Sequence, residues 1–235
     1  MDQYYRIAGL TVKMDAFGIT RDLAQPYGID SCSQADITIE ADLREMKALY
    51  PHVADEVLEY IVTGKDFYAK LTDFDGMMLH ASAIAVDGKA YLFSADSGVG
   101  KSTHTKLWQQ VFGEEQVVII NDDKPALRLR EGVWYVYGTP WSGKHTVNQN
   151  VCCPLAGICF LERGRTNTVE PYSKDDAVFR LLKQTYRPKD LRRADKVMLM
   201  VGSLLEKIPM WRMKCNMEPE AVQIARDAME KGRIL

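Results

Sequence analysis

The sequence has 235 residues, of which 46% are hydrophobic and 26% are charged. This suits one globular domain with a buried core, or such a domain with a small appendage. The 30 basic and 32 acidic residues give a formal net charge of -2, so no basic field points to nucleic acid and no acidic excess points to disorder.

The number and spacing of the cysteines and the absence of long apolar runs indicate an intracellular protein. The first residues, MDQYYRIAGL, hold no basic stretch followed by an apolar run, and no run of about 18 apolar residues occurs. We expect a soluble, cytoplasmic protein that binds neither a membrane nor nucleic acid. The cysteines are odd in number and lack C-x-x-C spacing, so we expect reduced, mostly buried thiols: Cys32, Cys152, Cys153, Cys159 and Cys215.

The first part of the chain, residues 1–75, predicts a small strand-rich section with a bridging helix. Residues 53–61 carry apolar side chains at helical spacing, and Gly64 predicts the end of that helix. Two β-prone runs flank a turn-rich stretch: residues 4–12 and 37–39, and between them residues 25–33.

The main body, residues 76–235, predicts a mixed sheet. Asp87-Gly88 and Glu131-Gly132 are two-residue hairpin signals, so the strands beside them run antiparallel. The predicted strands are residues 81–86, 89–93, 117–120, 126–130, 133–137 and 156–161.

Four helices are predicted in the main body. One covers residues 103–111, and Ser173 with Asp176 begins another, which continues through residues 177–186. Pro188 and Pro219 each open a helix, the last one reaching Met229. We interpret the methionines of this region as adaptable core filling: Met198, Met200, Met210, Met213 and Met217.

The segment between strand 89–93 and helix 103–111 is close to the phosphate-loop pattern G-x-x-x-x-G-K-[ST], with Ala95 in place of the first glycine. Phosphate binding needs backbone N–H groups that converge on the oxygens, with a helix N-terminus behind them. The alternative is an ordinary glycine-rich turn, but the strand-loop-helix context favours nucleotide binding. The expected binding residues are Ser97, Gly98, Val99, Gly100, Lys101, Ser102 and Thr103.

Paired carboxylates follow the next buried strand. Asp122 and Asp123 come directly after residues 117–120, and α/β proteins bind ligands at the carboxyl ends of strands. Lys101 can hold the β- and γ-phosphates and the Ser102 hydroxyl can bind Mg²⁺. One aspartate can bind the metal while the other accepts the proton of an attacking hydroxyl. A structural turn is the alternative for this pair.

Other polar residues are candidates for the same site. His80 precedes the first strand of a hairpin whose second strand ends at the loop, so the hairpin returns the loop to His80. Ser142 and Lys144 lie in a turn-rich loop suited to closing over a phosphate or a substrate. Arg163 and Arg165 follow a strand end and can stabilise charge, although exposed arginines are commonly only solvated.

The order of these elements resembles a known family. His80, then Ser97 to Ser102, then Asp122-Asp123 is similar to the catalytic domain of HPr kinase/phosphorylase and, more distantly, to the nucleotide site of phosphoenolpyruvate carboxykinase. The resemblance covers residues 77–144. Thr103 stands where HPr kinases typically have glutamate.

The resemblance implies an α/β fold, with a mixed-sheet P-loop core of the HPr kinase/phosphoenolpyruvate carboxykinase type, a small strand-rich N-terminal section and C-terminal helices. It implies a Mg²⁺-dependent kinase that transfers the γ-phosphoryl group of ATP to a hydroxyl group of a peptide, a protein or a metabolite. Because related kinases commonly assemble, it also implies a possible homo-oligomer. The expected catalytic residues are His80, Lys101, Asp122 and Asp123, and the expected metal ligands are Ser102 and Asp123.

Two other function classes stay open on the sequence. One is a nucleotide-gated binding module that transfers nothing, and the other is a carboxykinase-like lyase, for which the chain is short. A protein-kinase fold is not expected, because H-R-D and D-F-G elements are missing.

Overall fold

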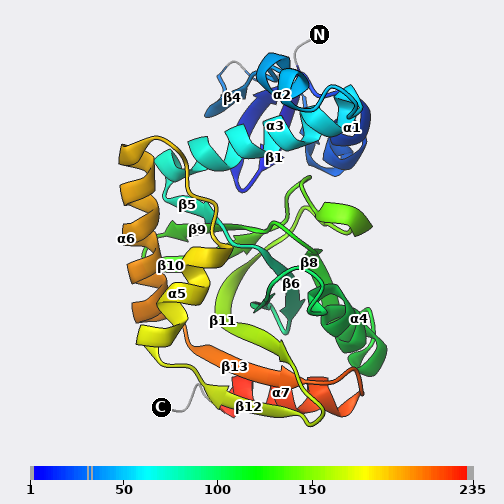
Figure 1. Ribbon diagram of the computed structural model, residues 1–235, viewed down its shortest axis with the longest axis vertical. Helices are drawn as coiled ribbons and strands as arrows, with labels where there is room; N and C mark the ends of the chain where they lie inside the picture. The colour runs from blue at the N-terminus through cyan, green and yellow to red at the C-terminus, as the bar shows by residue number, and fades with distance from the viewer. Residues whose placement is uncertain (1–2, 31, 33, 232–235) are drawn as a thin grey trace.

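The computed structural model describes residues 3–30, 32 and 34–231. Within these residues lie seven α-helices and thirteen β-strands, arranged as a small N-terminal sheet and a large mixed sheet flanked by helices (Figure 1). No helix in this described part of the chain has the length and apolar character needed to cross a membrane.

The small sheet has the strand order β3-β1-β2-β4. The predicted β-prone run at residues 4–12 forms two strands and not one, because Ala8 and Gly9 adopt positive φ angles of 52° and 74° and fold it into a hairpin. Ser31 and Ser33 of the predicted turn-rich stretch lie outside the described residues. The strands are β1 (Tyr4–Ile7), β2 (Leu10–Met14), β3 (Gly28–Ile29) and β4 (Ile37–Ile39).

Three helices belong to this part of the chain: α1 (Gly18–Ala24), α2 (Arg44–Leu49) and α3 (Asp55–Leu71). The predicted helix end at Gly64 is wrong, because α3 continues for seven residues beyond it. Gly64 instead allows close packing: a Cβ atom there would lie 2.7 Å from Cδ1 of Trp141. Helix α3 runs between the small sheet and the rest of the molecule (Figure 1) and contacts β4 and β5.

The large sheet confirms the predicted mixed α/β class. Its path is β5-β9-β10-β11-β7-β6-β8, and β13 pairs with both β11 and β12. Strand β11 runs parallel to β7 and β13, and the other pairs are antiparallel. The strands are β5 (Gly76–Met78), β6 (Ala81–Val86), β7 (Lys89–Ser94), β8 (Val117–Asn121), β9 (Ala126–Arg130), β10 (Val133–Tyr137), β11 (Cys152–Arg163), β12 (Thr168–Pro171) and β13 (Met210–Cys215).

Both predicted hairpin turns are confirmed. Asp87 and Gly88 have φ angles of 50° and 70°, and Glu131 and Gly132 have 50° and 82°, which is the backbone of a type I′ turn. The first turn sets Ala81 opposite Ser94. This register brings the residue before β6 next to the residue after β7.

Helices cover both faces of the large sheet, because side chains alternate along its strands. On β7, Ala90 and Leu92 pack towards α5 (Lys174–Gln184) and α6 (Leu191–Lys207). Tyr91 and Phe93 pack towards α4 (Lys101–Phe112) and α7 (Glu220–Lys231) on the opposite face (Figure 1).

The predicted start of α5 is confirmed, since Ser173 Oγ accepts a hydrogen bond from the backbone N–H of Asp176 at 3.2 Å. The predicted continuation to residue 186 is wrong, because the backbone is extended at Thr185. Pro188 does not open α6 directly. Asp190 caps that helix by accepting from the backbone N–H of Arg193 at 2.9 Å.

The methionine and cysteine interpretations hold only in part. Met200, Met210 and Met213 are buried, whereas Met198 is 48% exposed and Met217 is 64% exposed. All five cysteines are free, but only Cys159 is buried; Cys152 is exposed and the other three are half-buried.

Candidate active site

The loop between β7 and α4, residues 95–100 and called here the β7–α4 loop, has two glycines with a left-handed backbone. Gly98 and Gly100 have φ angles of 80° and 123°, which favour glycine, and a Cβ atom at either would meet nothing within 4 Å. Ala95 is buried and has no positive φ. The backbone therefore does not need a glycine at this first position.

Lys101 is folded into the loop. Its Nζ donates a hydrogen bond to the carbonyl oxygen of Ala95 at 3.0 Å, and the residue is only 7% exposed. Burial lowers the pKa of Lys101, while the carboxylates of Asp123 and Asp122 act in the opposite direction. The ammonium group is thus largely shielded from solvent and is affected by the charges of two acidic side chains.

Asp122 is tied to the first turn of α4 through two buried hydroxyl groups. Ser82 Oγ donates to Asp122 Oδ1 at 2.8 Å, and the same Oγ lies 2.8 Å from Thr105 Oγ1. Thr105 Oγ1 also lies 3.2 Å from the carbonyl oxygen of Ser102. This chain of contacts links Asp122 to the helix turn that carries Lys101 and Ser102.

Asn121 shapes the turn that presents the two aspartates, a role that the sequence analysis missed. Its Oδ1 accepts from the backbone N–H groups of Asp123 at 2.9 Å and Lys124 at 2.7 Å. Its Nδ2 donates to the carbonyl oxygen of Thr139 at 3.0 Å. An asparagine side chain commonly forms a hydrogen bond with the backbone two residues later in the chain. The residue type at position 121 could therefore have predicted this turn.

Asp123 lies between two basic side chains. His80 Nε2 is 3.1 Å from Asp123 Oδ1, and Lys124 Nζ pairs with Oδ2. Burial raises the pKa of Asp123, but hydrogen bonds and charge from His80 and Lys124 outweigh it and leave the pKa well below its usual range. The carboxyl group is therefore ionised at neutral pH.

The other ring nitrogen of His80 is held by Gln184, a second residue that the sequence analysis missed. His80 Nδ1 lies 2.8 Å from Gln184 Oε1. Gln184 Nε2 donates to Asp96 Oδ1 at 2.7 Å, and Lys183 Nζ donates to Asp96 Oδ2 at 2.7 Å. The end of α5 thus connects the β7–α4 loop to His80.

The loop after β10, residues 138–145 and called here the Trp141 loop, packs onto this site. Gly143 lies so close to Asp123 that a Cβ atom there would meet Asp123 Cγ at 2.7 Å. The backbone N–H of Gly143 donates to the hydroxyl oxygen of Tyr60 at 3.0 Å. Ser142 is buried and Lys144 is exposed. Helix α3, which carries Tyr60, therefore holds the loop in place.

These side chains meet in one cavity of about 960 Å³, called here the central cavity. Its apolar wall comes from α1 and α3, with Ile19, Val57 and Ile61. Its polar wall holds the predicted residues His80, Ser97, Gly98, Gly100, Lys101, Ser102, Thr103, Asp122, Asp123, Ser142 and Lys144.

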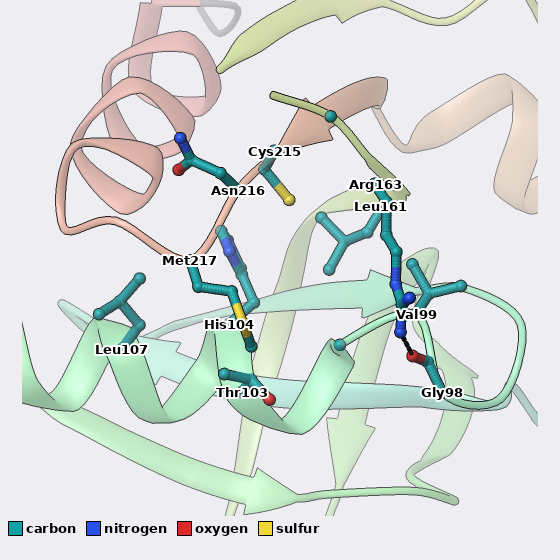
Figure 2. A pocket seen from close by; sticks show the side chains of 12 residues that line it. Gly98, Val99, Thr103, His104, Leu107, Leu161, Arg163, Cys215, Asn216 and Met217 are labelled. Atoms are coloured by element: carbon teal, nitrogen blue, oxygen red, sulfur yellow. Dashed lines mark hydrogen bonds between the residues drawn. The ribbon is translucent and has the colours of Figure 1, made fainter. Parts of the chain in front are cut away.

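Three predicted residues lie outside the central cavity: Val99, Arg163 and Arg165. Arg163 contacts the outer side of the β7–α4 loop, where its Nη2 donates to the carbonyl oxygen of Gly98 at 2.5 Å. Arg163 and Val99 line a second pocket, which shares the loop with the central cavity (Figure 2). Arg165 is exposed and lines neither of these cavities.

The oxygen ligands expected for Mg²⁺ are present in the central cavity. In the described part of the chain, no group of three or more His, Cys, Asp or Glu side chains is placed to hold a metal ion by itself. Mg²⁺ is usually bound by one or two carboxylates together with substrate phosphates and water. The Ser102 hydroxyl and the carboxylates of Asp122 and Asp123 fit that chemistry.

The sequence matches one family model, described as SynChlorMet cassette protein ScmC, over residues 54–220. This is more than half of the chain. The chain belongs to the ScmC family. The ScmC match includes α3, the β7–α4 loop, both aspartates and Gln184, and it excludes the small N-terminal sheet.

A solved structure, the Hpr(Ser) kinase/phosphatase from Coxiella burnetii, is similar with a TM-score of 0.41 at 10% sequence identity. The match covers 66% of this chain and 98% of that chain. No curated protein matches the sequence. The family that the sequence matches is thus ScmC, and kinase activity stays a prediction.

Proposed function

We propose that this ScmC-family protein is an ATP- and Mg²⁺-dependent phosphotransferase that moves the γ-phosphoryl group to a hydroxyl group. One observation carries the proposal. A glycine-bearing loop at a helix N-terminus, a buried lysine, two aspartates and a histidine, far apart in sequence, line a single cavity. Because ATP is a cytoplasmic substrate, we propose that the protein acts in the cytoplasm.

The β7–α4 loop and Lys101 would bind the triphosphate. Positive φ at Gly98 and Gly100 lets backbone N–H groups turn towards bound oxygens, and the N-terminus of α4 favours negative charge. Lys101 would exchange its bond to the carbonyl of Ala95 for phosphate oxygens. Charge neutralisation at the β- and γ-phosphates is the main catalytic contribution expected in phosphoryl transfer.

Ser102 and Asp122 would hold Mg²⁺, which neutralises phosphate charge when bound. Ser82 and Thr105 tie together the two segments that carry them, the turn after β8 and the first turn of α4. Asp123 lies outside this network and is paired with His80 and Lys124 instead. We therefore favour Asp122 over Asp123 as the carboxylate ligand.

Asp123 would receive the proton of the attacking hydroxyl. The hydroxyl oxygen bonds to the γ-phosphorus while the bond from that phosphorus to the bridging oxygen breaks, releasing ADP. The proton passes to ionised Asp123 and then to solvent. His80 orients this carboxylate through its contact with Oδ1. The acceptor would enter between the polar wall and the apolar wall of α1 and α3.

The test is incubation of the purified protein with Mg²⁺ and γ-labelled ATP against serine-containing peptides, proteins and small alcohols, with Lys101→Ala as the control variant. We expect label on one acceptor, and none with the variant. Nucleotide binding that depends on Lys101 without any transfer would overturn the phosphotransferase and support a nucleotide-gated module. Absence of Lys101-dependent nucleotide binding would overturn both.

A further inference from the structure

A second pocket, of about 530 Å³, lies on the other side of the β7–α4 loop (Figure 2). It is called here the outer pocket. Its walls are α4, the end of β11 and the loop between β13 and α7. The residues that line it are Gly98, Val99, Gly100, Thr103, His104, Leu107, Leu161, Arg163, Gly164, Cys215, Asn216 and Met217.

The outer pocket and the central cavity share one stretch of chain. Gly98, Gly100 and Thr103 line both. A linear ligand whose phosphates lie along the β7–α4 loop would have the central cavity on one side and the outer pocket on the other. Such a ligand has its reactive end on one side of the loop and its other end on the opposite side.

The chemistry of the two spaces differs. Lys101, Asp122, Asp123 and His80 line the central cavity. The outer pocket is mainly apolar, and among its described lining residues Arg163 is the charged side chain. His104 is neutral there at physiological pH, because burial lowers its pKa from 6.5 to about 3. Only the central cavity is equipped to act on a phosphoryl group.

Met217 is the unusual feature of the outer pocket. Its side chain extends from the loop before α7 towards α4 (Figure 2), and it is 64% exposed although the neighbouring Leu107 and Leu161 are buried. A flat aromatic group entering the pocket would cover this thioether and the aliphatic side chains beside it, and methionine packs well against aromatic rings.

We infer that the outer pocket holds the base and ribose of the nucleotide whose phosphates lie on the β7–α4 loop. The inference rests on the proposed function and adds the direction in which the nucleotide binds: the γ-phosphate in the central cavity and the base against Met217 and Leu107. The volume is within the usual range of small-molecule sites, and apolar packing supplies the affinity. The geometry makes this a site for a nucleotide and not for inorganic polyphosphate alone.

The test compares the affinities of Mg²⁺-ATP and of inorganic tripolyphosphate by calorimetry. Met217→Ala is the variant, and Met198→Ala, at an exposed methionine on α6, is the matched control. We expect Met217→Ala to weaken ATP binding about tenfold and to leave tripolyphosphate binding unchanged. Met198→Ala should change neither affinity.

Each other outcome overturns the inference. Unchanged ATP affinity in Met217→Ala, or equal losses for both ligands, would contradict a base site in this pocket, and so would an equal effect of Met198→Ala. A Lys101→Ala variant separates this from the proposed function. If Lys101→Ala weakens binding of both ligands while Met217→Ala has no effect, the phosphate site stands and the base site falls. If Lys101→Ala has no effect on either affinity, the phosphate site is refuted, and the proposed function is refuted together with the base site.

Discussion

The side-chain oxygen of Gln184 accepts a hydrogen bond from Nδ1 of His80 at 2.8 Å. The orientation of the amide is fixed from its other end, because Gln184 Nε2 donates to Asp96, whose carboxylate can only accept. His80 Nδ1 must therefore carry a proton, and Nε2 is the nitrogen that faces Asp123.

We predict that Gln184→Met, which keeps the volume but removes both hydrogen bonds, lowers turnover roughly ten- to a hundredfold, because small misplacement of catalytic groups is costly. The Michaelis constant for ATP should change little. Steady-state kinetics test this, with Lys183→Met as the control: it also loses a bond to Asp96 but leaves His80 untouched. Equal losses in the two variants would contradict positioning by Gln184.

The close packing of Gly64 in α3 against Trp141, in the loop beside the site, leads to a prediction about stability. Trp141 stacks on Phe67 at 4.8 Å between ring centroids, and its Nε1 donates to Thr63 Oγ1 at 3.2 Å. A methyl group at Gly64 would press on the same ring. We predict that Gly64→Ala destabilises the fold by about 1–3 kcal/mol, the range for overpacking, as measured by chemical denaturation.

Gly202 in α6 is the matched control for this substitution. A Cβ atom there would meet nothing within 4 Å. Gly202→Ala should therefore stabilise the fold by about 0.5–1 kcal/mol, the usual gain from replacing a helical glycine. If Gly64→Ala also stabilised the protein, tight packing of Trp141 on α3 would be refuted.

His104 makes stability depend on pH. It is buried, its Nε2 accepts from Trp108 Nε1 at 3.1 Å, and burial lowers its pKa from 6.5 to about 3. Between these values the unfolded chain binds the proton and the folded chain does not, so stability falls as the pH falls. We predict a loss of about 2 kcal/mol between roughly pH 7 and pH 5 from this residue.

Denaturant titrations at several pH values measure this loss. The variant His104→Gln keeps an acceptor for Trp108 but has no titratable ring. Its free energy of unfolding should change less over the same pH range, by about the amount assigned to His104. An identical pH dependence in the two proteins would mean that His104 does not stay neutral in the fold.

Much of the large sheet could be predicted, because its signals are local. The turn residues Asp87-Gly88 fixed a hairpin, and the hairpin register alone placed His80 beside the start of the β7–α4 loop. Lys101, Asp122 and Asp123, which the motif order grouped in one site, line the same cavity, and their roles stay predictions.

The features that the sequence could not predict depend on contacts between residues far apart in the chain. Gly64 looked like a helix stop, and its contact with Trp141, far along the chain, is invisible to a local pattern. Gln184 is an ordinary helix residue until the fold brings it to His80. Met217 was interpreted as core filling, and only the loop geometry shows that it faces a pocket.

The most direct test of the central claim is the rate of γ-phosphoryl transfer from ATP in the protein and in its Asp123→Asn variant, which keeps the shape of the side chain but removes its charge. We predict transfer at least about a hundredfold slower in the variant, the usual contribution of a general base, with ATP binding retained. Transfer at an unchanged rate would contradict the role of Asp123, and no transfer by the unmodified protein to any hydroxyl would contradict the phosphotransferase itself.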